Sequence, residues 1–356
     1  MTDGSDPSRP DPPAPIRTPA VESTRRLLGA SFDLLTRASD DMRRASFYVG
    51  IVVLCTVGPI ALASWALEVA ARHMTAREVQ VVVVGAAGGS LGLLGILAGL
   101  GVVVATVESR AMAAGILGGQ LAARPIGVGA ALARSRMVFW RVIVASMIAG
   151  IPVLIVQRAI QAGFDALLGP AVDVSILAST LAAAIVGAPL AYLLSGVVLG
   201  DVDPFEATRR SFRVFRARKA AAVLVAVFET IAILLVVLGL GAGLDLVLRV
   251  FEALGLGPGS GPVGLALVTL GVLAGVFALG TLIYTALAIS IAPQVVMFVG
   301  LTHASFGLDH VQPGGDRDPT VRRPGERRFR WLTIPMLIGL LVGAIGLAWF
   351  VGMLRA

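Results

Sequence analysis

Long uncharged apolar stretches, separated by arginine-bearing segments, constrain this sequence more than any other feature. Several stretches approach or exceed the roughly 20 residues that a helix needs to cross about 30 Å of hydrocarbon. The connecting segments alternate between arginine-rich and arginine-poor, and this alternation predicts which side of a membrane each connection faces. The uncharged stretches include residues 45–67, 79–107, 142–157, 174–200 and 331–354.

The composition excludes a soluble globule. Hydrophobic residues make up 56% of the chain and charged residues only 14%, whereas soluble proteins average about 25% charged residues. The net charge of +7 favours anionic lipid head groups over nucleic acid as the partner, because the basic residues flank the apolar stretches. Cys55 is the sole cysteine, so we expect neither a disulfide nor a cysteine metal site, and no cofactor.

We therefore predict an all-α, polytopic membrane bundle of about seven transmembrane helices. Residues 1–22 are rich in proline and predict a disordered cytoplasmic tail. A six-helix membrane domain with interfacial helices follows over 23–310, then a basic cytoplasmic loop over 311–330 and an additional transmembrane helix within 331–356. The predicted spans are 47–70, 80–107, 142–164, 174–200, 220–248, 262–290 and 331–354.

The distribution of basic residues predicts the orientation. Twenty-four of the 29 basic residues fall in four segments on one side, and only Arg72, Arg77, Arg158, Arg249 and Arg355 fall on the other. Because cytoplasmic loops carry the excess of Lys and Arg, the amino terminus is expected in the cytoplasm and the carboxyl terminus outside. This count assigns Arg110 and the residues up to Arg141 to a cytoplasmic connection.

The stretch 253–308 has no Asp, Glu, Lys or Arg and is long enough for two spans. It lacks a turn motif in its middle, and a second span would move the basic residues after Asp316 outside. We therefore predict one long helix, followed at Pro293 by an interfacial return to the cytoplasmic surface.

Basic amphipathic segments precede several spans. The first, 23–46, places leucines on one stripe, and the second begins at Asp203-Pro204-Phe205-Glu206, a capping-box pattern for a helix start. We expect Phe205, Thr208, Phe212 and Phe215 to share the apolar face of that helix. Such a helix is either an interfacial anchor or a docking surface for head groups or a membrane-protein partner. The candidate head-group contacts are Arg134, Arg136, Arg209, Arg210, Arg213 and Arg216.

Glu229 is the candidate functional residue within the membrane. It follows Lys219 by ten residues, which places it about 15 Å deep in a helix. An intramembrane carboxyl marks a functional site by default, because its burial is costly. The alternative is a protonated side chain that makes one interhelical hydrogen bond. No Lys or Arg is expected at the same depth, which favours a neutral carboxyl or a water-filled pocket.

Enzyme motifs are weak. Residues 88–92 match the nucleophile-elbow pattern Gly-x-Ser-x-Gly, but they lie in an apolar helical stretch rather than after a strand. No phosphate-binding loop or zinc-protease motif occurs. We therefore expect a non-enzyme.

Three segments resemble a bacterial family, the membrane domains related to those attached to glycerophosphoryl diester phosphodiesterases. They are Leu-Leu-Gly-Ala-Ser-Phe-Asp-Leu-Leu-Thr-Arg at 27–37, Phe-Glu-Ala-Thr-Arg-Arg-Ser-Phe at 205–212, and 299–308. The resemblance covers about 24–310. Family members often carry a Tyr-x-Asp-Leu-Arg-like segment after span six, where this chain has Val-Gly-Leu-Thr-His at 299–303. No segment between the spans is long enough for the phosphodiesterase barrel, so the resemblance implies a six-helix membrane unit of unassigned role.

These patterns predict a non-catalytic integral protein of the cytoplasmic membrane, acting as a scaffold, a lipid-contacting module or a partner subunit. The second hypothesis is a transporter or permease for a small molecule or lipid, with Glu229 in a central pocket. The two differ in what they require of Glu229. Transport requires that it face a cavity, whereas a scaffold permits it to lie in dry packing.

Overall fold

The computed structural model describes residues 24–71, 92–168, 172–253 and 261–306, together with Phe329, Leu341, Val342 and Ile345. Every regular element in these residues is a helix, as predicted. The predicted tail, most of the basic loop and most of the seventh span lie outside the described residues, so they stay predictions.

Among the described residues, five helices are long and apolar enough to cross a membrane. A bent pair, Ser175–Leu190 with Leu193–Leu199, makes a sixth if it counts as one span. The chain thus has the makeup of a multi-pass membrane protein. The five segments are Ser39–Ser64, Gly92–Leu121, Val128–Leu167, Lys219–Val236 and Ala266–Thr302.

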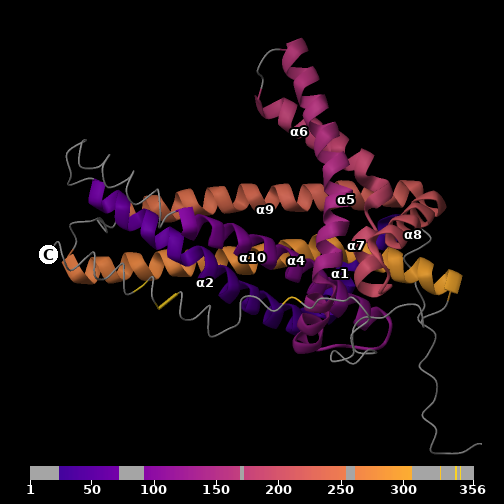
Figure 1. Cartoon of the computed structure of the whole chain (residues 1–356), viewed down its shortest axis with the longest axis horizontal. Helices are drawn as coiled ribbons and strands as arrows, with labels where there is room; N and C mark the ends of the chain where they lie inside the picture. Colours follow the sequence, from indigo (N-terminus) through magenta and orange to yellow (C-terminus); the bar gives the residue numbers. More distant parts are fainter. Residues whose placement is uncertain are drawn as a thin grey trace, which may run out of the picture.

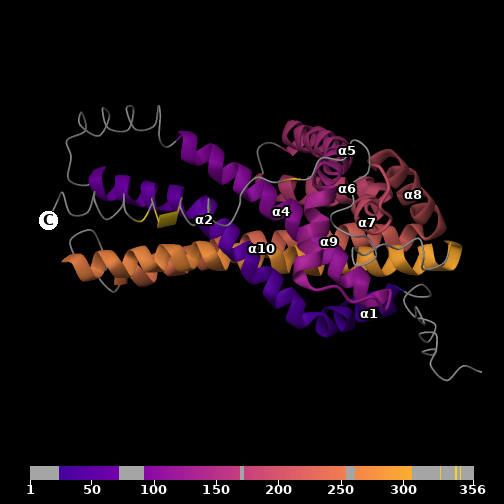
Figure 2. The same cartoon turned by 60° about the horizontal axis from the view of Figure 1, so that its bottom comes forward.

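Four long helices run lengthwise side by side and form the bundle (Figures 1 and 2). They are α2 (Ser39–Ala71), α4 (Gly92–Leu121), α9 (Lys219–Ala253) and α10 (Gly261–Phe306). The helix α10 packs against the other three and is the central element. The helices contact their neighbours through apolar side chains, and these side chains form one continuous hydrophobic core.

The closest approach of α2 and α10 requires glycine. A Cβ atom on Gly280 would lie 2.8 Å from the Cα of Gly50, which belongs to the backbone and cannot rotate away. Glycine lets the two backbones approach closely, as small residues commonly do where membrane helices cross. This crossing fixes the position of α10 against α2.

Within 253–308 the structure describes residues 261–306 after Ala253, and these form one helix as predicted, but the interfacial return after Pro293 is wrong. The helix α10 continues through Pro293 to Phe306, and 46 residues extend about 69 Å, more than twice the hydrocarbon thickness. Residues 291, 292 and 295–299 are at most 3% exposed. This segment is therefore surrounded by protein, whereas an interfacial helix would expose one face, and the packing offsets the hydrogen bond that Pro293 cannot make.

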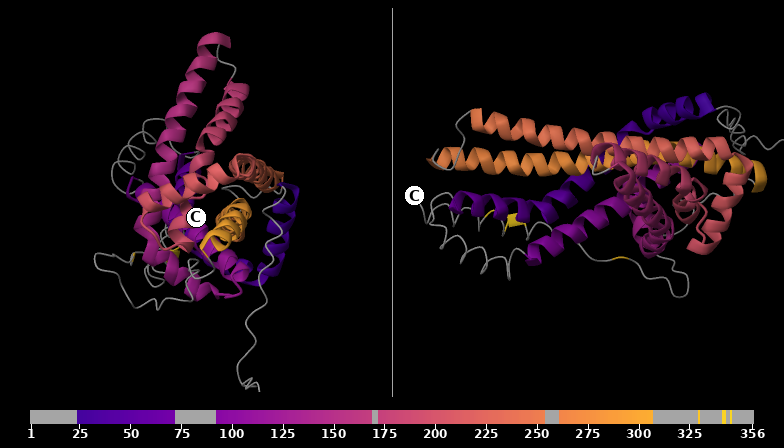
Figure 3. Two further views of the ribbon diagram at one scale, coloured as in Figure 1. Left: turned by 90° about the vertical axis from the view of Figure 1, so that its right-hand side faces the viewer. Right: turned by 90° about the horizontal axis from the view of Figure 1, so that it is seen from above.

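Helices α5 (Val128–Leu168) and α6 (Val172–Gly187) form a hairpin that leaves the bundle at a steep angle (Figures 1 and 3). The predicted span 174–200 is not one straight helix. Below α6 the chain forms the short 3-10 helix η3 (Ala188–Leu190) and then α7 (Leu193–Leu199), with a bend of 41°. Pro189 lies in η3, just before this break, and cannot donate a backbone hydrogen bond there.

Two amphipathic helices occupy one end of the bundle together with α7 (Figure 1). The helix α1 (Thr24–Arg37) buries Leu27 and Leu34 and packs mainly against α10. The helix α8 (Pro204–Ala217) lies between α7 and α9 in the sequence and packs on α7. Both helices lie in segments that were predicted to be amphipathic, but the first prediction, 23–46, is too long, because 39–46 belong to α2.

Candidate functional site

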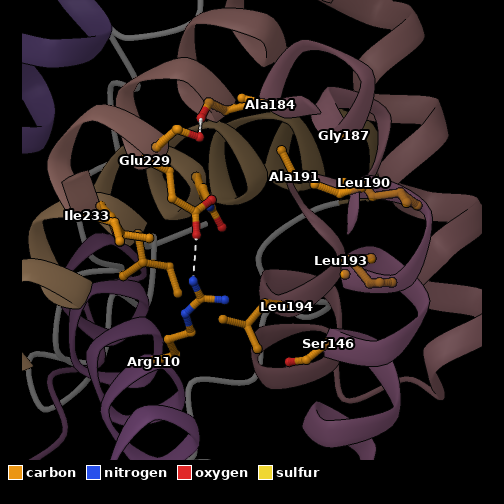
Figure 4. Close-up of a pocket in the computed structure, with 18 of the residues that line it drawn as sticks. Arg110, Ser146, Ala184, Gly187, Leu190, Ala191, Leu193, Leu194, Glu229 and Ile233 are labelled. Carbon is orange, nitrogen blue, oxygen red and sulfur yellow. Dashed lines mark hydrogen bonds and ion pairs between the residues drawn. The ribbon is translucent and has the colours of Figure 1, made fainter. Parts of the chain in front are cut away.

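A cavity of about 280 Å³ lies where the α5–α6 hairpin meets the bundle (Figure 4). Its walls come from α4, α5, α6, η3, α7, α9 and α10. Most lining side chains are small or apolar, among them Val153, Leu190 and Ile233. The polar ones are Arg110, Ser146, Glu229, Thr230, Ser290 and Gln294. A mostly apolar cavity with a few convergent polar groups is the usual form of a small-molecule site.

Glu229 lies on the wall of this cavity and is held by two side chains. Arg110 Nη2 donates to Glu229 Oε1 at 2.9 Å, and Gln294 Nε2 donates to Glu229 Oε2 at 2.6 Å. The side chains of Arg110 and Glu229 keep 28% and 21% of their surface exposed. The three side chains therefore join α4, α9 and α10, while both charged groups still face the cavity (Figure 4).

The expectation that no basic residue lies at the depth of Glu229 is wrong. Arg110 belongs to α4, which continues without a break from Gly92 to Leu121, so it does not lie in a connecting segment. The prediction failed because every arginine was counted as a loop residue. An indication was present in the sequence, since Glu108 and Arg110 carry opposite charges and no glycine or proline separates them from the apolar residues before.

A second charged group ties α2, α4 and α5 together around Glu108. Arg136 Nε donates to Glu108 Oε1 at 3.0 Å, Tyr48 Oη donates to Glu108 Oε2 at 2.9 Å, and Arg136 Nη2 donates to Tyr48 Oη at 3.0 Å. The Glu108 side chain is 1% exposed. All members are satisfied within the protein, which is the condition for a buried polar network to stabilise a fold.

The segment after α10 reaches this part of α5. The backbone N–H of Phe329 donates to the carbonyl of Arg136 at 3.0 Å, and the Phe329 ring stacks on Phe139 with centroids 4.1 Å apart. Phe329 is 3% exposed. Phe329, the one residue of the predicted basic loop that the structure describes, therefore packs against α5.

A third charged group surrounds Asp201, between α7 and α8. Arg134 Nη2 and Arg141 Nη2 lie 2.9 Å and 3.0 Å from Asp201 Oδ1, and Arg134 also donates to the carbonyl of Val198. Burial alone would raise the pKa of the Asp201 carboxyl, but the two guanidinium groups hold that pKa below its ordinary value. Asp201 has a φ of 48°, a left-handed conformation that a side-chain carboxylate tolerates better than most.

Two candidate head-group contacts therefore lie inside the protein. Arg134 is 3% exposed and Arg136 is 20% exposed, and each pairs with a carboxylate of the same chain. These interactions orient the two guanidinium groups toward protein carboxylates rather than toward lipid. Head-group contact remains a hypothesis for the arginines of α8 alone.

The helix α8 begins as its capping pattern predicts, since Asp203 accepts hydrogen bonds from the backbone N–H of Phe205 and Glu206. Two of the four residues on its predicted apolar face are exposed. Phe205 and Phe212 are 72% and 40% exposed. The face against the protein carries small and apolar residues instead, namely Pro204, Ala207, Ser211 and Val214.

The arginines of α8 lie mainly on its outer side. Arg209, Arg213 and Arg216 are exposed, whereas Arg210 is partly covered and lies 3.4 Å from Glu206 Oε1. The outer face of α8 therefore combines exposed phenylalanines with exposed arginines.

Ser211 connects α8 to the cavity wall. Its Oγ donates to the carbonyl of Pro189 at 2.7 Å and accepts from the backbone N–H of Tyr192 at 3.2 Å. Pro189 belongs to η3, and the neighbouring Leu190 and Ala191 line the cavity. The position of α8 thus determines the position of one cavity wall.

No family model matches this chain, and no curated protein or solved structure matches it either. The resemblance to the membrane domains of glycerophosphoryl diester phosphodiesterases therefore rests on the sequence segments alone.

Proposed function

We propose that this chain is a multi-pass protein of the cytoplasmic membrane that binds and moves a small molecule through the cavity at Arg110 and Glu229, without catalysing a reaction. The observation that carries the proposal is the position of the ion pair on a cavity wall. A scaffold does not need its charged groups to face a cavity, whereas a transporter does. This placement favours the transporter hypothesis over the scaffold hypothesis.

The helices around the cavity contain the irregularities that a moving wall requires. Pro152 lies within α5, next to the lining residue Val153, and the chain bends by 41° between α6 and α7. Breaks in membrane helices are tolerated where they lie within protein or line a cavity. Rotation of the α5–α6 hairpin about these two points would open or close one side of the cavity.

Access to the cavity tests the proposal. Thr230, on the lining, is replaced by cysteine in a Cys55→Ser background, and a membrane-impermeant anionic thiosulfonate is applied to right-side-out and inside-out vesicles. A carrier that opens in turn to each side is expected to be labelled in both preparations. Val225→Cys is the matched control, because Val225 lies on the same helix and is fully buried. Absence of label at position 230 from both sides would contradict the proposal.

The proposed orientation places α8 on the cytoplasmic surface, with its outer face against anionic head groups. Support comes from the exposure of Phe205 and Phe212 beside that of Arg209, which is 79% exposed. Each basic residue near an anionic surface contributes about 1 kcal/mol. Arg213→Cys should react with an impermeant thiol reagent only from the cytoplasmic side, and reaction from outside would reverse the orientation.

A further inference from the structure

The Arg110–Glu229 pair differs from the other two interhelical charged groups in its access to the cavity. Its side chains are 28% and 21% exposed, whereas Glu108 and Asp201 are each 1% exposed within their ion pairs. A sealed pair can exchange partners only if the helices separate. The Arg110–Glu229 pair can exchange partners by side-chain rotation, because the cavity already supplies the space.

Arg110 also keeps unused hydrogen-bond donors. Its Nη2 reaches Glu229, while no hydrogen bond among the described residues engages its Nε or Nη1. A guanidinium group offers five N–H donors and binds a carboxylate most strongly through two parallel hydrogen bonds. An anionic group that enters the cavity therefore finds an open edge of Arg110, on the same wall as Glu229.

The charge balance of the cavity then determines what must accompany the anion. Arg110 and Glu229 are the only charged residues among its described lining residues, so the cavity is neutral as it stands. An additional anion would leave one uncompensated negative charge in apolar surroundings, which is costly. Uptake of one proton by Glu229 restores neutrality and frees Arg110 for the anion.

We propose that the cavity binds a small organic monoanion together with one proton, with the anion on Arg110 and the proton on Glu229. In the exchange the Arg110–Glu229 ion pair is replaced by an ion pair between Arg110 and the ligand. The proton moves from water to Glu229 Oε1, and Gln294 keeps its hydrogen bond to Oε2. No covalent bond of the ligand changes. This inference rests on the proposed function, because it requires that the cavity be a binding site.

The walls restrict the class of ligand further. Val153, Leu190 and Ile233 offer only apolar surface, which suits a carboxylate with an apolar body. A zwitterion fits less well, because its cationic group would have to enter between Arg110 and Glu229, whose charged atoms are 2.9 Å apart. A cation fits least well, because Arg110 repels it.

Thermal stabilisation of the full chain in lipid nanodiscs tests the inference with four probes of similar size. The probes are benzoate, the neutral benzamide, the cationic benzylamine and the zwitterionic phenylalanine. We expect stabilisation by benzoate alone. Because one proton is taken up with each anion, the apparent affinity for the anion should rise as the pH falls. Benzoate should therefore raise the melting temperature more at pH 5.5 than at pH 8.

Two variants separate the roles of the pair. Glu229→Gln imitates the protonated state, so it should bind benzoate at both pH values with equal affinity. Arg110→Gln should lose benzoate binding. Arg213→Gln is the charge-matched control, because this exposed arginine of α8 lies outside the cavity, and it should bind benzoate like the unmodified protein.

Three outcomes overturn the inference. The first is stabilisation by benzylamine or phenylalanine, the second is benzoate binding that is equal at both pH values in the unmodified protein, and the third is no stabilisation by any probe. Should Arg110→Gln fail to fold, the pH dependence of Glu229→Gln against the unmodified protein decides. Failure of the proposed function is seen separately. If the proposed function is wrong, Thr230→Cys is not labelled from either side. If Thr230→Cys is labelled but benzoate has no effect, only the anion–proton inference is rejected.

Discussion

Replacement of a carboxylate by its amide should affect Glu108 and Glu229 very differently. Glu108 is sealed between α2, α4 and α5, and Glu108→Gln leaves the Arg136 guanidinium, itself 20% exposed, without a compensating charge. Removal of one partner of a buried ion pair typically costs 3–5 kcal/mol. The amide oxygen still accepts a hydrogen bond, so we expect the lower end, about 3 kcal/mol.

Glu229→Gln should cost less, because the pair is partly exposed and water in the cavity can solvate Arg110. The pair lies between an exposed ion pair, which contributes about 0–1 kcal/mol, and a sealed one. The amide of Gln294 can turn to accept from the new side chain, so we expect a loss of about 1 kcal/mol. At about 2 °C per kcal/mol for a chain of this size, the melting temperature should fall about 6 °C in Glu108→Gln and about 2 °C in Glu229→Gln.

The assay is the loss of monodisperse protein on size-exclusion chromatography after heating, performed side by side on both variants in the same detergent. Equal losses would show that the two pairs serve the same structural role, and the distinction between sealed and cavity-facing charges would be refuted. A larger loss for Glu229→Gln would also refute the assignment of Glu108 as the structural group.

Three further predictions concern the fold around the site. Gly280→Ala should destabilise by about 1–3 kcal/mol through overpacking, whereas Gly275→Ala on the same helix, with open space at its Cβ position, should be neutral or stabilising in the same heating assay. The lowered pKa of Asp201 stabilises the fold above the unfolded value near 4, and this contribution is lost as the pH falls through the folded value. The difference in melting temperature between the unmodified protein and Asp201→Asn should therefore shrink below pH 4. Ser211→Ala removes the hydrogen bond to Pro189, so it should alter thiol reactivity inside the cavity more than overall stability.

The helical architecture could be predicted from the sequence because apolar length and period are local properties. Hydropathy located the long helices, and the capping pattern located the start of α8 to the residue. The limits of α4 and α10 could not be predicted in this way. Charged residues end a membrane helix only when they lack partners, and Glu108 and Arg110 have partners 28 and 119 residues away in the sequence.

The orientation of α8 shows why the surroundings of its candidate head-group residues could be predicted only in part. The sequence places Phe205 and Phe212 on one apolar face of an interfacial helix, but it does not indicate whether that face packs on protein or on lipid. In a membrane protein lipid also accepts apolar side chains, so the contact with protein can be made by small residues instead. A Cβ on Gly196 would lie 3.1 Å from the Cβ of Ala207, so a larger residue at either position would push α8 away from α7.

Among the described residues, Glu108, Asp201 and Glu229 pair with arginines of another element. The exposure of these carboxylates to a cavity distinguishes a structural role from a functional one better than their positions in the sequence do. Glu108 and Asp201 are each enclosed and each accept from at least two donors, so their charges hold helices and loops in place. Glu229 is equally well bonded, yet it borders a cavity with Arg110 beside it. A partly exposed pair contributes little to stability, while a carboxyl at the predicted depth of Glu229 would be costly to place. A charged group that is costly to bury and adds little stability is expected where that group binds a ligand.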